Sequence, residues 1–302
     1  MEKTPGPLIR TSSHPCFNER AKDFFGRAHL PVAPGCNIQC RYCNRVYDCV
    51  NESRPGVTSK VFSPEEASEY LDRLLARMPW IAVAGIAGPG DAFHDPERTL
   101  TTLEMIRRTH PELNLCISTN GLNIAPYVGE LSRLGVGYVT VTVNAVSPRI
   151  GALIYDYAMD GSNWIDGIDA AGLLLDRQME AVRALKGSGM TVKVNTVVIP
   201  DVNDQHVTEI AKLVSALGAD IMNIIGIIPV PGTSFEHIRP LTADFLKELR
   251  QSAGHYLPQM SHCVRCRSDA VGLLRCSSSG RSCGSGRDHD APHGTGKVLA
   301  GF

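Results

Sequence analysis

The residues best suited to chemistry in this chain are its cysteines. Three of them, Cys36, Cys40 and Cys43, form a CxxxCxxC motif. Three thiolates at this spacing can bind three corners of a [4Fe–4S] cluster, and the fourth iron is then open to a small molecule. A zinc site is the alternative, but zinc sites favour paired CxxC units and four ligands. The motif therefore favours an iron–sulfur cluster.

Cysteine usage across the chain indicates the same chemistry. No apolar run approaches the roughly 18 residues that span a bilayer, and residues 1–10 lack the apolar region of a secretory signal, so we expect a cytoplasmic protein. Disulfides are rare in that compartment, and the ten cysteines are better explained there by metal binding or catalysis.

The net charge of −1 argues against a broad basic face that would bind nucleic acid. We expect no nucleic-acid partner and no membrane partner.

Hydrophobic patterning predicts a repeated order of strand and helix. Six short runs are apolar almost throughout, as parallel strands are when helices cover their outer face. Ser63 begins one helix with a capping box, Asn203 or Asp204 is expected to cap another, and a third is expected over 242–253. The predicted strands are 30–33, 81–86, 113–118, 138–146, 192–199 and 221–228.

Six βα units without an evident linker predict an α/β fold. The expected architecture is a partial (β/α)6 TIM-like barrel, open because it is two strands short of eight. A doubly wound sheet is the alternative, although no GxGxxG motif follows the first strand. In either architecture the functional side chains gather at the carboxyl ends of the strands. The cysteine motif follows the first predicted strand, so it lies at that end.

A CxxxCxxC motif after the first strand of such a chain resembles the radical S-adenosylmethionine (SAM) superfamily. The resemblance implies an enzyme of lyase or transferase type. In that superfamily the open iron binds the amino and carboxylate groups of SAM, and an electron from the cluster cleaves SAM to a 5′-deoxyadenosyl radical. A Gly-Gly-Glu-like turn usually holds the SAM amino group, and here Asp91 replaces the glutamate. The residues expected to bind SAM are Gly88, Gly90, Asp91, Thr142, Asn144, Asn195 and Ile199.

The other cysteine motifs resemble the NifB family of nitrogenase cofactor maturases. These motifs are SHPCF at 13–17, the continuation of the CxxxCxxC motif through Cys49 into NESRPGV at 51–57, and HCVRC at 262–266. The similarity covers roughly residues 12–275. Many members carry an additional C-terminal carrier-like domain, whereas this sequence ends in a Ser/Gly-rich segment, so it resembles the stand-alone form.

The resemblance implies two [4Fe–4S] substrate clusters beside the cluster that binds SAM. One is expected on His29, Cys49 and Cys116, with His29 at the start of the first strand and Cys116 near the carboxyl end of the third. The other is expected on Cys16, Cys263 and Cys266. Glu52 is the candidate for moving protons or positioning a cluster, and it joins Cys36, Cys40 and Cys43 in the expected catalytic set.

The implied reaction fuses the two substrate clusters into an eight-iron precursor with insertion of a SAM-derived carbide and a sulfide. One SAM donates a methyl group, and a second is cleaved to the radical that abstracts hydrogen from it. The implied partners are an iron–sulfur cluster donor, a carrier or scaffold protein and an electron donor such as a ferredoxin. Two alternatives stay open: a radical SAM enzyme with one auxiliary cluster on Cys263, Cys266 and Cys276 that acts on a nucleotide or peptide, and a non-catalytic cluster carrier.

The resemblance also divides the chain. We expect an N-terminal extension over 1–28 that carries a cluster ligand, a radical SAM core over 29–254 and a C-terminal cluster-binding segment over 255–276. The two extensions are expected to close the barrel mouth. Five Ser and five Gly among residues 277–296 predict a flexible tail over 277–302.

Overall fold

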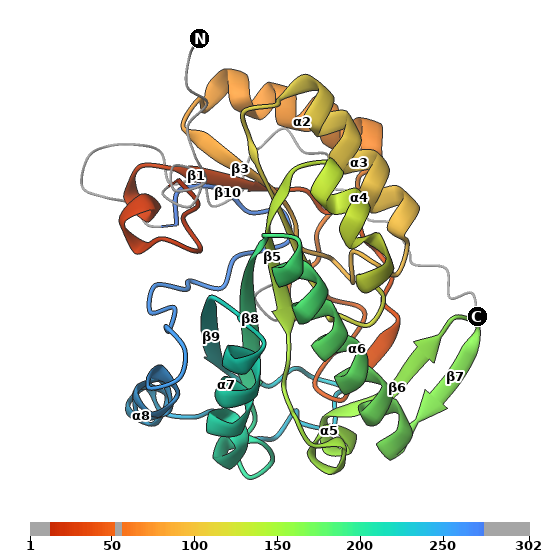
Figure 1. The fold of residues 1–302 in the computed structure, drawn as a ribbon, viewed down its shortest axis with the longest axis vertical. Helices are drawn as coiled ribbons and strands as arrows, with labels where there is room; N and C mark the ends of the chain where they lie inside the picture. The colour runs from red at the N-terminus through yellow and green to blue at the C-terminus, as the bar shows by residue number, and fades with distance from the viewer. Residues whose placement is uncertain (1–12, 52–55, 275–302) are drawn as a thin grey trace.

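A curled, open sheet of seven strands forms the centre of the molecule (Figure 1). The computed structural model describes residues 13–51 and 56–274. The strands are β1 (Gly26–His29), β3 (Ile81–Ile86), β4 (Asn114–Thr119), β5 (Val136–Thr142), β8 (Thr191–Val198), β9 (Ile221–Gly226) and β10 (Val271–Gly272). Their order is β10-β1-β3-β4-β5-β8-β9, with all neighbours parallel except the antiparallel edge strand β10. Six parallel strands in chain order confirm the predicted partial (β/α)6 barrel.

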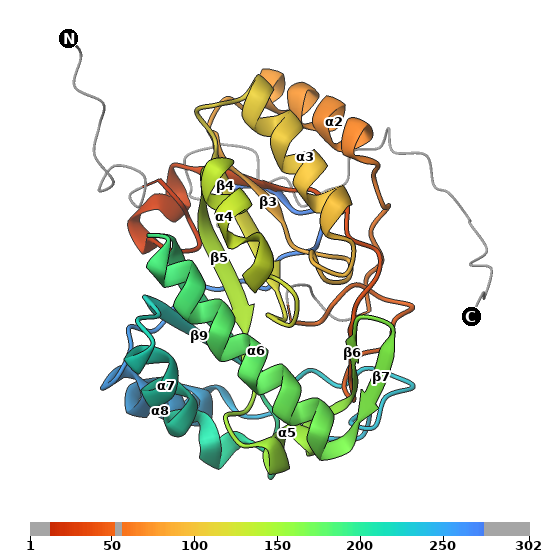
Figure 2. The ribbon, with the colours of Figure 1, turned by 45° about the vertical axis from the view of Figure 1, so that its right-hand side comes forward.

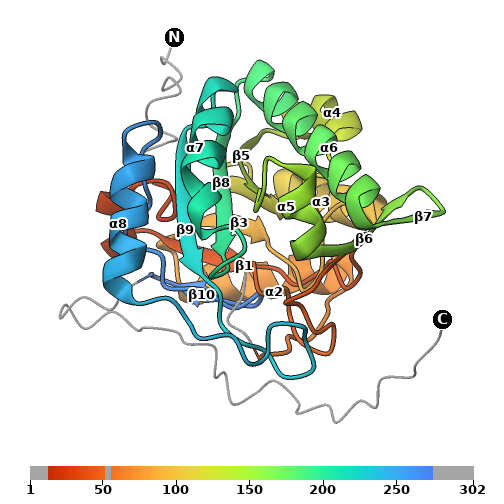
Figure 3. The same ribbon diagram turned by 90° about the horizontal axis from the view of Figure 1, so that it is seen from below.

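Helices cover the outer face of this sheet (Figures 2 and 3). They are α2 (Pro64–Arg77), α3 (Pro96–Thr109), α4 (Val128–Arg133), α5 (Pro148–Ile154), α6 (Gly167–Gly187), α7 (Val207–Ala216) and α8 (Ala243–Gly254), with short 3-10 helices η1 (Glu19–Asp23), η2 (Ala125–Tyr127) and η3 (Asp204–His206). Fully buried Leu103, Leu115 and Val182 belong to the main core between these layers. No helix in the described ranges is long and apolar enough to cross a membrane.

Two of the three predicted helix starts are confirmed. Ser63 and Glu66 form a reciprocal capping box, with Glu66 N donating to Ser63 Oγ at 3.1 Å and Ser63 N to Glu66 Oε2 at 2.9 Å. Thr242 caps α8. The prediction for Asn203 or Asp204 is wrong, because neither side chain caps a helix. The Asn203 side chain instead accepts a hydrogen bond from Ile199 N at 2.7 Å and donates to two backbone carbonyls.

The first strand lies earlier than predicted. Residues 30–33 are apolar and buried, but the paired strand is Gly26–His29, which lies between β3 and β10. Pro31 has no backbone N–H to donate to a sheet, so regular pairing ends before it. His29 is therefore at the carboxyl end of β1, not at its start. Cys116 is also corrected, since it lies in the middle of β4.

A second, three-stranded sheet was not predicted. Its strands are β2 (Ile38–Cys40), β6 (Tyr155–Asp160) and β7 (Asn163–Asp166), in the order β2-β6-β7. The β6–β7 hairpin projects beside α5 and α6 (Figure 2). Because β2 lies inside the CxxxCxxC motif and Cys40 pairs with Tyr155, this small sheet fixes the backbone of the motif.

Candidate active site

The three cysteines of the CxxxCxxC motif line one cavity at the carboxyl ends of the strands. Cys36, Cys40 and Cys43 share this first cavity with Cys49 and with residues that end β4 and β5. The turn between the last two motif cysteines is closed by the Cys43 N–H, which donates to Cys40 O at 2.9 Å. Gln39 Nε2 donates to both of these residues' carbonyls, at 2.9 and 2.7 Å. The motif is thus a tight loop that presents three thiols to one space.

Burial controls the protonation of these thiols. It raises the pKa of Cys36 to about 11 and raises the pKa values of Cys40 and Cys43 as well. Burial also disfavours the charged guanidinium of Arg45, but the thiolates of Cys36 and Cys43 raise its pKa overall. The thiols therefore ionise only together with cation binding, and Arg45 offsets part of the negative charge that results.

The donor set of the first cavity fits a [4Fe–4S] cluster. Among residues 13–51 and 56–274, no three His, Cys, Asp or Glu side chains lie close enough to hold a single metal ion. A cluster binds each thiolate at a different iron, so its ligands are spaced more widely than those of a single ion. Three thiols on one loop are sufficient for three of its corners.

Five further side chains of the types that bind metals line a second cavity. Cys16 comes from the N-terminal extension, His29 from β1, Cys116 from β4, and Cys263 and Cys266 from the C-terminal segment. The two extensions therefore meet across the interior of the barrel. Asn51 and Ser118 line both cavities, so the two spaces adjoin. Cys49 lines the first cavity, whereas His29 and Cys116, with which it was expected to bind one substrate cluster, line the second.

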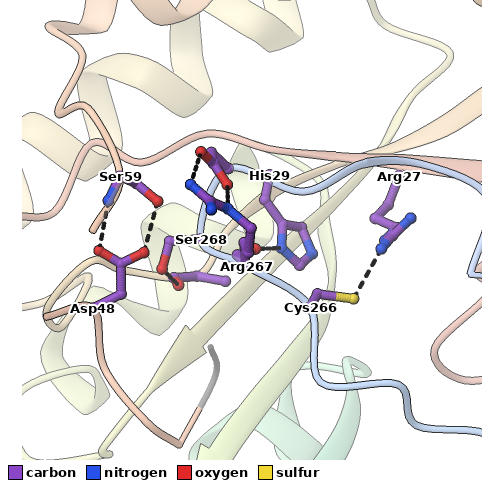
Figure 4. A network of polar contacts seen from close by, with 9 residues as sticks. Arg27, His29, Asp48, Ser59, Cys266, Arg267 and Ser268 are labelled. Carbon is purple, nitrogen blue, oxygen red and sulfur yellow. Dashed lines mark hydrogen bonds and ion pairs between the residues drawn. The ribbon is translucent and has the colours of Figure 1, made fainter. Parts of the chain in front are cut away.

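Cationic side chains surround the second cavity. Lys193 and Arg265 line it, and Arg27 donates to Cys266 Sγ at 2.9 Å (Figure 4). Burial raises the pKa of Cys16 to about 11, although Lys193 and Arg27 act in the opposite direction. Thiolate ligands bring negative charge, and buried charge requires compensation. The lining is suited to an anionic guest.

His29 is held as a neutral imidazole. Its pKa is lowered to about 4, mainly by burial and secondly by the nearby charge of Arg27. Its Nδ1 lies 3.0 Å from the Arg267 carbonyl oxygen, which can only accept, so Nδ1 carries the proton (Figure 4). The lone pair is then on Nε2, the arrangement typical of a metal-binding histidine.

The comparisons with known proteins agree with this geometry. The model of the Radical SAM superfamily matches residues 30–214. The chain belongs to the radical SAM superfamily. FeMo cofactor biosynthesis protein NifB of Chlorobaculum tepidum is 49% identical over 266 residues, 88% of this chain and 63% of that protein. NifB of Azotobacter vinelandii is 42% identical over 269 residues, 88% of this chain and 53% of that protein. The chain thus spans less than two thirds of the length of these relatives.

Solved radical SAM folds resemble the structure at low sequence identity. Streptococcus suis SuiB superposes with a TM-score of 0.55 at 15% identity, covering 78% of this chain and 49% of that one. Methylornithine synthase PylB gives a TM-score of 0.53 at 14% identity, covering 91% and 80%. This likeness shows the fold, a partial α/β barrel.

The radical SAM turn at 88–91 is packed tightly against the cysteine loop. A Cβ atom on Gly90 would lie 1.8 Å from the Gly35 carbonyl oxygen, so only glycine fits. Pro89 O accepts from Cys49 N at 2.7 Å. Asp91 lines the first cavity, but its carboxylate already accepts hydrogen bonds from Phe93 N, Asn120 N and the Thr119 hydroxyl. Its contact with the SAM amino group stays a prediction.

The other predicted SAM contacts lie in different surroundings. Thr142 lines the first cavity, whereas Asn195 lines the second. Asn144 is fully buried, donates to the Tyr42 hydroxyl at 2.6 Å and accepts from Val197 N at 2.8 Å. Ile199 is fully buried in the apolar cluster behind the motif, and Gly88 packs against Ser268. Within the described chain, only Gly90, Asp91 and Thr142 of the predicted SAM residues line the motif cavity.

Two residues at the first cavity were missed from the sequence. Asn120 follows β4 and donates to Asn37 Oδ1 at 2.6 Å and to Cys36 Sγ at 3.6 Å; its place after a strand was the available signal. Gln178 on α6 is buried and donates to Asn120 O and Thr142 O, and no sequence signal marked it. Predictions that lie outside the described residues concern Glu52, Cys276 and the segment 277–302.

Replacing Gly90 with alanine should destabilise the fold by about 3 kcal/mol, because the new methyl group meets a backbone carbonyl that cannot rotate away. Thermal unfolding measures the loss. Gly172→Ala is the matched control, since it adds a methyl group to α6 with no heavy atom within 4 Å and should stabilise by up to about 1 kcal/mol. Equal melting temperatures for the two variants would contradict the close approach.

Replacing Arg27 with methionine should loosen the C-terminal segment. Arg27 is buried and donates to Gly272 O and Leu273 O as well as to Cys266 Sγ, so the change leaves buried acceptors unpaired at a cost of about 2–4 kcal/mol. Hydrogen exchange should accelerate over 266–273. Arg133→Met, at an exposed pair with Glu130, should change stability by no more than about 0.5 kcal/mol. Unchanged exchange at 266–273 would show that Arg27 does not anchor the segment.

Proposed function

We propose that the chain is a maturase of the nitrogenase cofactor. It fuses two [4Fe–4S] substrate clusters, with insertion of a SAM-derived carbide and a sulfide, into an eight-iron precursor. The observation that carries the proposal is the second cavity, where Cys16, His29, Cys116, Cys263 and Cys266 gather beside the radical SAM motif. A radical SAM enzyme with a single auxiliary cluster would need only three of these five side chains. The relatives called FeMo cofactor biosynthesis protein NifB support the same conclusion.

Cys36, Cys40 and Cys43 would hold the resident cluster. When bound, that cluster supplies the electron that cleaves SAM. The chain's own part is positioning: β2 and β6 fix the Cys40 backbone, and Asp91 ties the SAM turn to the end of β4. Reacting groups held near contact distance in a site that excludes water gain most of the available rate enhancement.

The substrate clusters would be held loosely, by three protein ligands each. We assign one to Cys16, Cys263 and Cys266 and the other to His29, Cys49 and Cys116. Cys49 lines the first cavity, and the next two residues, Val50 and Asn51, line the second, so this cysteine belongs at the wall between the two spaces. A neutral imidazole is displaced more readily than a thiolate, which suits release of a fused product. Glu52, next along the chain, is the proposed residue for protons or cluster positioning.

The proposed partners follow from this chemistry. Substrate clusters require an iron–sulfur cluster donor, the product requires a carrier or scaffold protein, and SAM cleavage requires an electron donor such as a ferredoxin. The eight described cysteines are all free thiols, in keeping with the reducing cytoplasm, which we propose as the location.

The count of iron and acid-labile sulfide after anaerobic reconstitution tests the proposal. Three four-iron clusters require about twelve irons per chain. About eight irons would favour a radical SAM enzyme with one auxiliary cluster, and about four would leave the resident cluster alone. Cys40→Ala and Cys263→Ala should each lower the count by about four, and the double variant by about eight, if the two cysteines serve different clusters.

A further inference from the structure

His14 lies in the second cavity and has no assigned role. Its side chain is 1% exposed and lines the cavity together with Cys16, Cys263 and Cys266. The ring packs against Phe17 and Tyr138, with centroid distances of 4.7 and 4.4 Å. Two aromatic neighbours fix its plane, so the direction of its nitrogens is set by packing.

The hydrogen bond to Nδ1 sets the tautomer of His14. Cys16 N donates to His14 Nδ1 at 3.2 Å. A ring nitrogen that accepts a hydrogen bond carries no proton, and the neutral imidazole then has its proton on Nε2. His29, in the same cavity, has the opposite arrangement, because its Nδ1 faces the Arg267 carbonyl. His29 thus offers a lone pair to the cavity, whereas His14 offers an N–H donor.

The Nε2 atom of His14 is buried and has no hydrogen-bond partner in the described chain. Buried donors are nearly always paired, and an unpaired one destabilises the fold. Thr140 Oγ1, on another residue that lines the cavity, is buried without a partner as well. Both His14 Nε2–H and the Thr140 hydroxyl can donate, and two such groups on one cavity indicate a guest that accepts hydrogen bonds.

We propose that His14 Nε2–H donates a hydrogen bond to a sulfur of the substrate cluster held by Cys16, Cys263 and Cys266. The proposal rests on the proposed function, which places that cluster there. His14 is then a positioning and tuning residue and is not an iron ligand. Hydrogen bonds to cluster sulfurs stabilise the more negative, reduced state and raise the reduction potential. The cluster is thereby oriented by a group that is not bonded to iron and does not obstruct its later release.

Two amide variants separate the two nitrogens of His14. His14→Asn keeps an acceptor near the Nδ1 position but has no donor at the Nε2 position, whereas His14→Gln places an amide N–H near Nε2. Both are made in the full chain carrying Cys40→Ala, which removes the resident cluster. The cluster signal that Cys263→Ala eliminates is then followed by redox titration with electron paramagnetic resonance. His237→Asn, at a side chain that is 93% exposed, is the control.

We expect unchanged iron content in all three variants. The midpoint potential should become more negative in His14→Asn, return toward the parent value in His14→Gln and stay constant in His237→Asn. Equal potentials in His14→Asn and the parent, or equal shifts in the Asn and Gln variants, would overturn the hydrogen bond. Loss of about four irons in His14→Asn would also overturn it by making His14 a ligand. If Cys263→Ala removes no cluster signal, the proposed function fails instead.

Discussion

Cys40→Ala should reduce formation of 5′-deoxyadenosine to the level of a sample without protein. Cys40 is the central cysteine of the motif, it is 5% exposed, and its backbone is fixed by pairing with Tyr155. Cys49 lines the same cavity, but the proposed function assigns it to a substrate cluster. Without a third ligand the cluster loses a corner and about four irons with it. Anaerobic incubation with SAM and dithionite, followed by chromatography of the nucleoside products, measures the effect.

The fold of the Cys40 variant needs a separate control. Cys40 packs in an apolar cluster with Ile38 and Tyr42, and removing one buried sulfur should cost about 1 kcal/mol. A melting temperature within a few degrees of the parent, both measured without clusters, would show that the barrel is intact. Retention of SAM cleavage in a folded variant would mean that the motif does not hold the resident cluster.

Local sequence patterns predicted most of the radical SAM framework. The capping box at Ser63, the Thr242 cap and the apolar runs of the inner strands depend on residues close together in the chain. The CxxxCxxC loop is local in the same way, because three of its hydrogen bonds are made within eight residues, two by the Gln39 side chain and one by the Cys43 N–H. Such signals are readable without knowledge of the fold.

Non-local pairing explains the errors. Pairing with β10, more than 240 residues away, places β1 at Gly26–His29, and no apolar pattern marks that partner. Asn203 has the residue type of a helix cap, but its side chain is hydrogen-bonded to the buried carbonyl of Asn144 and the backbone N–H of Ile199 instead. The β6–β7 hairpin was missed because its two strands are short and carry many polar residues. Most of their side chains are partly or fully exposed, including Trp164, so no apolar run marks the strands.

The sequence also could not show which cysteine lines which cavity. Cys16 and Cys263 are brought to one cavity by the meeting of the two extensions, as the resemblance implied. Asn195 lines the same cavity and pairs with Asn223 on β9, although the resemblance to the radical SAM superfamily implied a contact with SAM. Which cavity a strand residue faces depends on barrel curvature, which a linear pattern does not contain.

Cys263→Ala should retain radical cleavage of SAM but form no fused eight-iron precursor. Cys263 and Cys266 lie on one irregular segment, and Arg265 between them has a φ of 50°, a left-handed conformation that is uncommon for a residue with a side chain. Strained backbone of this kind is maintained where the surrounding structure requires it, often at functional sites. Here it allows both thiols of the segment to line the second cavity. Without the Cys263 thiol, the proposed substrate cluster keeps only Cys16 and Cys266 as ligands, which are too few to hold it during the reaction.

Two measurements on the Cys263 variant decide between the maturase and its rival. Nucleoside analysis should show 5′-deoxyadenosine, because the first cavity is lined by other cysteines, and iron-edge X-ray absorption should show no eight-iron species. Cys276→Ser is the matched comparison: it should still form the precursor if Cys16 completes the ligand set, whereas an auxiliary cluster on Cys263, Cys266 and Cys276 would be lost in both variants. Precursor formation by Cys263→Ala would refute the assignment of this cysteine to a substrate cluster.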